Sequence, residues 1–147
     1  MISTKDRFKI NLPDGWEDQT VYTFRGPDNS GVQHMMMLNV DRHLQAEDIT
    51  SFAEEKTDPI IQALQGVEVL KDEEVTLENG NPVYEFVYKW VPSDGNVIFQ
   101  KHVFVIKDGI GFNFSAGFSK KTIKTIGTQM SEIVESLLPG TYLPIED

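Results

Sequence analysis

Apolar and polar residues alternate in several runs along the chain, and this alternation predicts strands. The pattern is clearest in two consecutive runs, Val83 to Val91 and Val97 to Ile106, because successive side chains of a strand point to opposite faces. Both runs carry apolar residues on both faces. Further strands are predicted at Phe8–Leu12, Gln19–Arg25, Gln33–Arg42, 67–77 and 110–115, and the strand that contains the first long run is expected to begin near residue 81.

Two segments show helical spacing instead. Asp48–Leu64 places apolar residues on one stripe, and Pro59 is expected to kink or restart this helix. The second helix is predicted from an N-cap at Ser119 to a stop at Pro139-Gly140. The order βββαββββα predicts one α+β domain over residues 1–147, with a single antiparallel sheet and both helices packed on one face.

Three dipeptides favour two-residue hairpins: Asn79-Gly80, Asp94-Gly95 and Asp108-Gly109. A two-residue loop at Asp94-Gly95 pairs Val87 with His102, and the resulting register separates two faces. One face is aromatic and is expected to be the core that the helices cover. It holds Tyr84, Phe86, Tyr88 and Trp90 with Phe112 and Phe114.

The other predicted face is apolar but carries scattered hydrogen-bonding groups. It holds Val87, Gln100, His102, Phe104, Asn113 and Ser115, joined by Val21, Thr23, Met35, Met37 and Asn39 from the earlier strands. Three consecutive methionines in a strand cannot all point inward. Exposed apolar patches of this kind mark interaction surfaces. The alternatives are that the tail Thr141–Asp147 covers the face, or that one strand has another register.

Composition narrows the classes of partner. The net charge of −10 disfavours nucleic acid and anionic membrane surfaces. The chain has no cysteine, which excludes disulfides and thiolate chemistry. Met1 to Arg7 is polar, and no run approaches the roughly 18 apolar residues of a membrane span. We therefore expect a cytoplasmic protein without stable membrane insertion.

Catalytic and cofactor motifs are missing from the sequence. There is no nucleophile elbow, zinc-protease helix, phosphate loop or calcium loop. His34, His43 and His102 are scattered, whereas metal-binding histidines usually come with other ligands at recognisable spacing. The sequence therefore predicts neither an enzyme nor a bound metal or cofactor.

Several segments resemble the DcrB-like family, which has the PsbP-like fold. The opening stretch from Phe8 to Val21, followed by Phe24, is similar to the start of that family. Later landmarks are Tyr88-Lys89-Trp90, the stretch from Gln100 to Phe104, and the closing helix with Ile133, Ser136 and Leu137. Stand-alone members of about this length resemble the effector-associated chaperones of type VI secretion.

The resemblance implies a homodimer whose sheets hold the hydrophobic N-terminal helices of a membrane-targeting effector until it is loaded onto the secretion spike. It places the client contacts at Val21, Thr23, Met37, Asn39, Asp41 and His102. A regulatory module that binds a folded protein, as in the Ran-binding branch of the fold, is the alternative. A hydrolase or other small-ligand enzyme is a third hypothesis.

Overall fold

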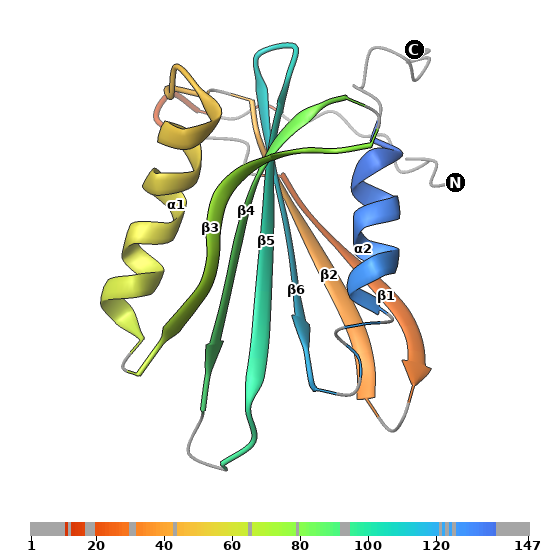
Figure 1. The fold of residues 1–147 in the computed structure, drawn as a ribbon. Coiled ribbons are helices and arrows are strands. Elements are labelled where there is room, and N and C mark those ends of the chain that lie inside the picture. The colour runs from red at the N-terminus through yellow and green to blue at the C-terminus, as the bar shows by residue number, and fades with distance from the viewer. Residues whose placement is uncertain are drawn as a thin grey trace.

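The computed structural model describes residues 11, 13–16, 20–29, 32–42, 44–64, 66–78, 80–91, 95–120, 122, 124 and 126–137. Within these ranges it contains a six-stranded sheet and two helices (Figure 1). The elements are β1 (Thr20–Asn29), β2 (Val32–Asp41), α1 (Ile49–Ala63), β3 (Glu68–Thr76), β4 (Pro82–Trp90), β5 (Ile98–Lys107), β6 (Ile110–Phe118) and α2 (Ile126–Glu135). The predicted α+β class and single antiparallel sheet are confirmed. The predicted strand Phe8–Leu12, apart from Asn11, and the tail Thr141–Asp147 lie outside the described residues.

The strands lie in the order β1-β2-β6-β5-β4-β3, and all neighbours are antiparallel. The β5–β6 hairpin is the two-residue turn that the sequence predicts. Lys107 pairs with Ile110, and the turn residues Asp108 and Gly109 have φ of 53° and 75°. A type I′ turn requires positive φ at both positions.

The β4–β5 register differs from the predicted one by a single residue. Trp90 pairs with Ile98, so residues 91–97 connect the strands in place of a two-residue loop. Phe86 therefore lies opposite His102, and Tyr84 lies opposite Phe104. A shift by one residue moves every side chain of a strand to the other face. The aromatic residues of β4 thus share a face with His102 and Phe104, and the predicted aromatic face with Phe112 was wrong.

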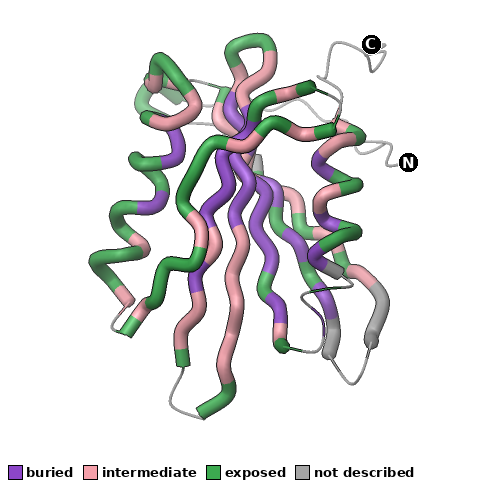
Figure 2. The backbone as a smooth tube through the Cα atoms, viewed as in Figure 1, coloured by how far each residue is buried: buried purple, intermediate pink, exposed green. Residues whose placement is uncertain are grey.

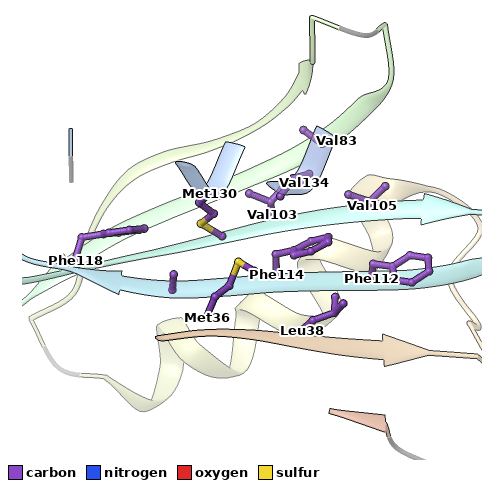
Figure 3. Close-up of a cluster of buried hydrophobic side chains, with 11 residues drawn as sticks. Met36, Leu38, Val83, Val103, Val105, Phe112, Phe114, Phe118, Met130 and Val134 are labelled. Atoms are coloured by element: carbon purple, nitrogen blue, oxygen red, sulfur yellow. The ribbon is translucent and has the colours of Figure 1, made fainter. Parts of the chain in front are cut away.

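The two helices lie on opposite faces of the sheet, with the strands between them (Figure 1). Phe52 of α1 belongs to one buried cluster with Phe86 and Phe104. Met130 of α2 belongs to another with Val103 and Phe114, drawn in Figure 3. Val103 and Phe104 are neighbours in β5 and so point to opposite faces. The prediction that both helices cover one face was wrong. We call the two surfaces the α1 face and the α2 face.

The helix boundaries are set by local chemistry. Asp48 caps α1 by accepting a hydrogen bond from the backbone N–H of Ser51 at 2.7 Å. The helix does not restart at Pro59 but continues to Ala63. Ser119 does not cap α2, because its backbone N–H donates to the Thr122 hydroxyl at 3.0 Å and the helix begins only at Ile126.

The core follows the central strands, and exposure rises toward β3 and the outer surface of the helices (Figure 2). Phe52 docks α1 onto the sheet, its ring edge-on to Phe104 at 82° with a centroid distance of 5.4 Å. Gly111 lets α1 approach this closely, since a Cβ there would lie 2.8 Å from Phe52 Cζ. Any side chain at position 111 would therefore have to displace the Phe52 ring or the helix that carries it.

Gly111→Ala should destabilise the protein by about 1–3 kcal/mol, as overpacking of a core usually does. The matched control is Gly117→Ala on the same face of β6, whose Cβ would meet only the movable end of Gln100 at 3.1 Å. Urea unfolding of both variants measures the difference. Equal free energies of unfolding for the two variants would contradict the close packing of α1 on Gly111.

Candidate binding face

Helix α1 covers only one side of its face. Its main sheet contacts are with β4 and β5, and β1 and β2 lie at the far end of the strand order. Val21, Met35 and Met37 there are exposed by 47%, 47% and 43%. We call this region the open half. Its residues are Val21, Thr23, Arg25, Met35, Met37, Asn39 and Asp41.

The three consecutive methionines of β2 illustrate how the open half arises. Met36 is buried in the cluster under α2, whereas Met35 and Met37 point to the other face and are exposed. The expectation that they cannot all point inward is confirmed. The long apolar side chains of Met35 and Met37 thus lie next to each other on the surface. Their partners on β1 are Arg25 and Thr23.

A band of polar side chains, which begins at Asn39 of the open half, borders the part of the face under α1. Asn39 lies opposite Asn113, and Ser115 lies opposite His102. The side-chain oxygen of Gln100 lies over Gly117. These groups are neutral hydrogen-bonding side chains at the border of an apolar surface.

His102 is the most confined member of this band, at 8% exposure. Its ring stacks at 16° on Tyr88 and at 13° on Phe104, and its Nδ1 lies 3.4 Å from the Asn113 side-chain oxygen. Burial among these rings lowers the pKa of His102, and the contact with Asn113 opposes this shift. The imidazole is therefore neutral at pH 7. Its Nε2 is buried without a hydrogen-bond partner.

On the opposite face of the sheet, several polar side chains are charged and form ion pairs. On the α2 face of β3, β4 and β5, Glu85 lies 3.1 Å from Lys71 and 3.8 Å from Lys101. Lys89 pairs with Glu68 at 3.2 Å in the same region. That part of the sheet is therefore covered by its own ion pairs. In the open half, the charged residues are Arg25 and Asp41, near its two ends.

The structure brings all the predicted client-binding residues together on the α1 face except Val87. Val87 lies on the α2 face, opposite Lys101, because the β4–β5 register differs by one residue from the predicted one. Phe104 is on the correct face but is fully buried under α1. Reasoning from sequence missed Arg25 and Gly117, although alternation along β1 from Val21 and Thr23 leads directly to Arg25.

Among the described residues, no group of three or more His, Asp or Glu side chains could hold a metal ion. No helix in the described part of the chain is long and apolar enough to cross a membrane.

The chain has an α+β fold. Its six-stranded antiparallel sheet carries one helix on each face, and α1 leaves one half of its face uncovered. More narrowly, the DcrB family model matches residues 9–136, and the chain belongs to this family.

One solved structure shows the same fold. The chain is similar to PA94, a Pseudomonas aeruginosa protein of unknown function, with a TM-score of 0.68 and 15% identity over 87% of this chain and 88% of that chain. It is also similar to LpqN, involved in cell envelope biogenesis of Mycobacterium tuberculosis, with a TM-score of 0.44 and 12% identity over 74% of this chain and 63% of that one. No curated protein matches the chain.

The buried neutral imidazole predicts a pH dependence. Because the folded-state pKa of His102 is lowered, its contribution to stability is complete above the unfolded pKa near 6.5 and is lost as the pH falls below that value. His102→Phe keeps the ring stack but removes the titration. It should reduce the slope of unfolding free energy against pH, below about pH 6.5, by at most about 1.4 kcal/mol per pH unit. Urea titrations between pH 5 and 7.5 test this, and parallel slopes would contradict it.

Proposed function

We propose that this protein is a cytoplasmic chaperone that binds the hydrophobic N-terminal transmembrane helices of a type VI secretion effector. It shields them from water until the effector is loaded onto the secretion spike. The observation that supports this most directly is the open half, where Val21, Met35 and Met37 are exposed beside a polar band. The function agrees with what the resemblance to effector-associated chaperones implies.

The chemistry of a transmembrane helix suits this surface. Apolar surface exposed to water costs about 25 cal/mol per Å², so a membrane helix in the cytoplasm needs an apolar cover. Such helices also carry occasional polar side chains that seek hydrogen-bond partners. The open half offers methionine and valine, and methionine adapts to irregular partners. Asn39 and Asn113 at its border offer amide donors and acceptors.

The width of the open half agrees with the width of one helix. Strands lie about 4.8 Å apart, so the outer two of the adjacent strands β1, β2 and β6 are separated by roughly 10 Å. An α-helix with its side chains is about 10–12 Å wide. One client helix therefore covers the open half and its polar border.

Charge favours a client over the membrane itself. The chain has a net charge of −10, and cytoplasmic membrane surfaces are negative. The exposed apolar surface is thus held away from lipid while it remains available to a protein segment. The sequence holds no nucleotide-binding motif, so in this proposal release is driven by assembly of the effector onto the spike.

A second copy of the chain completes the proposal. In the described part of the chain, β1 and β3 are the outer strands of the sheet. Strand β3 carries Glu68 and the run Lys71-Asp72-Glu73-Glu74, and charges on an edge strand oppose edge-to-edge pairing. The edge of β1 from Val21 to Phe24 is uncharged. Pairing of two β1 strands would join two open halves into one wider surface.

Single charges in the open half test client binding. The effector segment encoded next to this protein's gene is fused to a soluble carrier and co-expressed with it. Val21→Asp and Met37→Asp should each reduce co-purification of the fusion at least tenfold, because a carboxylate would be buried against an apolar helix. Leu70→Asp is the matched control, since Leu70 is 46% exposed on the opposite edge strand.

Other outcomes would reject the chaperone function. If the fusion is equally soluble without this protein, or if both open-half variants capture it normally, the open half does not shield the effector helix. Recovery of a soluble folded partner through the same residues would instead support a regulatory binding module.

The homodimer has its own measurement. Light scattering of the purified protein should give a mass near twice 16.7 kDa, or about 33 kDa. Val21→Lys together with Thr23→Lys should shift it toward the monomer, because like charges across a paired edge repel. A monomeric mass for the unmodified protein would contradict this part of the proposal.

A further inference from the structure

A cavity of about 160 Å³ lies on the α2 face, between helix α2 and strands β1, β2 and β6. Gln129, Met130 and Ile133 line it from the helix. Arg25 and Met35 also line it, but alternation directs their side chains to the α1 face, where they belong to the open half. The strand side chains that face the cavity are those of Phe24, His34, Met36, Ala116 and Phe118. The cavity and the open half therefore lie on opposite faces of the sheet.

Small residues of the strands leave this space beside α2. Ala116 stands between Phe114 and Phe118 on the same face of β6, and all three are buried. Gly26 of β1 also lines the cavity, and a Cβ there would lie 3.4 Å from the Cβ of His34. Larger side chains at positions 26 and 116 would occupy the space that the two small residues leave open.

The cavity reaches from the surface of the molecule to its core. Ile133 is 45% exposed on α2, and Gln129 is exposed as well. Met130, one turn before Ile133, is only 2% exposed, and Phe118 is 3% exposed. A small molecule can therefore enter beside Gln129 and Ile133 and come to lie against buried side chains.

The inner wall is apolar and rich in sulfur. Met36 and Met130 extend toward one another across the cavity (Figure 3). Among the described lining side chains, the buried polar one is that of His34, at 4% exposure. Ordered water in a cavity needs two to four polar partners, whereas an apolar cavity of about 150 Å³ takes up benzene. The size and chemistry of this cavity therefore fit one ring better than a cluster of water molecules.

We propose that this cavity is a binding site for a small, neutral, monocyclic aromatic molecule. The thioethers of Met36 and Met130 make favourable contacts with aromatic rings, and the rings of Phe24 and Phe118 add aromatic pairs. An ionised group buried without a partner is costly, so the buried part of the ligand is uncharged. A polar substituent would lie at the mouth, beside Gln129. This inference goes beyond the chaperone function and does not depend on it.

Phenol is the probe, and the methionines provide the readout. The chain has five methionines. The side chains of Met36 and Met130 face the cavity, whereas Met37 points to the other face of the sheet. In a sample labelled with ¹³C at the methionine methyl groups, phenol should shift the signals of Met36 and Met130 to saturation and leave that of Met37 in place. An unshifted Met130 signal, or equal shifts at all three methionines, would overturn the site.

Two further probes define the class of ligand. Cyclohexanol has a ring of similar size without aromatic character, and it should bind at least about threefold more weakly than phenol, because it loses the contacts between sulfur and the aromatic ring. Benzoate keeps the aromatic ring but carries a charge, and it should bind at least about tenfold more weakly. Equal binding of cyclohexanol would overturn the preference for aromatic rings, and equal or tighter binding of benzoate would overturn the preference for neutral ligands.

Cavity-filling variants locate the bound phenol. Ile133→Trp on α2 and Gly26→Leu on β1 each place a larger side chain at a lining position, and each should reduce the affinity for phenol at least tenfold. Glu132→Trp is the matched control, because Glu132 is an exposed neighbour on α2 that does not line the cavity. Urea unfolding identifies the variants that remain folded. If folded Ile133→Trp binds phenol as tightly as Glu132→Trp does, phenol does not occupy this cavity and the site is rejected.

Discussion

Strand β5 serves two hydrophobic cores at once, and the arrangement of the whole molecule depends on this. Phe104 and its even-numbered neighbours point toward α1, while Val103 and Val105 point toward α2. The sheet is a single layer, so each of these apolar sets needs its own cover. One helix on each face satisfies both sets, and Phe52 and Met130 are the side chains that bring the helices to the strand.

Because the helices are displaced from one another across the sheet, neither helix covers the whole of the face on which it packs. Helix α1 packs on β4 and β5, and α2 contacts β6. The β3–β4–β5 part of the α2 face is covered by the Lys71–Glu85–Lys101 ion pairs. The open half of the α1 face carries methionine and valine instead. The α2 face is thus covered by charged side chains, whereas the α1 face exposes apolar ones. Exposed apolar surface of this kind usually marks a site of interaction.

A polar band borders this exposed apolar surface. His102 is held neutral by the rings around it, so the border of the open half presents hydrogen-bonding groups without adding charge. The pairing of β2 with β6 ends at Met36 opposite Ala116. A helix bound on the open half would thus meet an apolar surface with a polar edge.

Local sequence signals determined most of the secondary structure of this protein. Alternation placed the strands, Asp48 marked the start of α1, and Asp108-Gly109 specified its turn, because each depends on neighbouring residues alone. Asp94-Gly95 is an equally local signal for a two-residue loop, but it does not set the register, because residues 91–97 connect β4 and β5. The β4–β5 register and the face of Val87 were decided by packing of Phe86 and Tyr88 under α1. The side on which each helix packs, and the cavity beside α2, depend on contacts between residues distant in sequence. Only the assembled sheet could determine them.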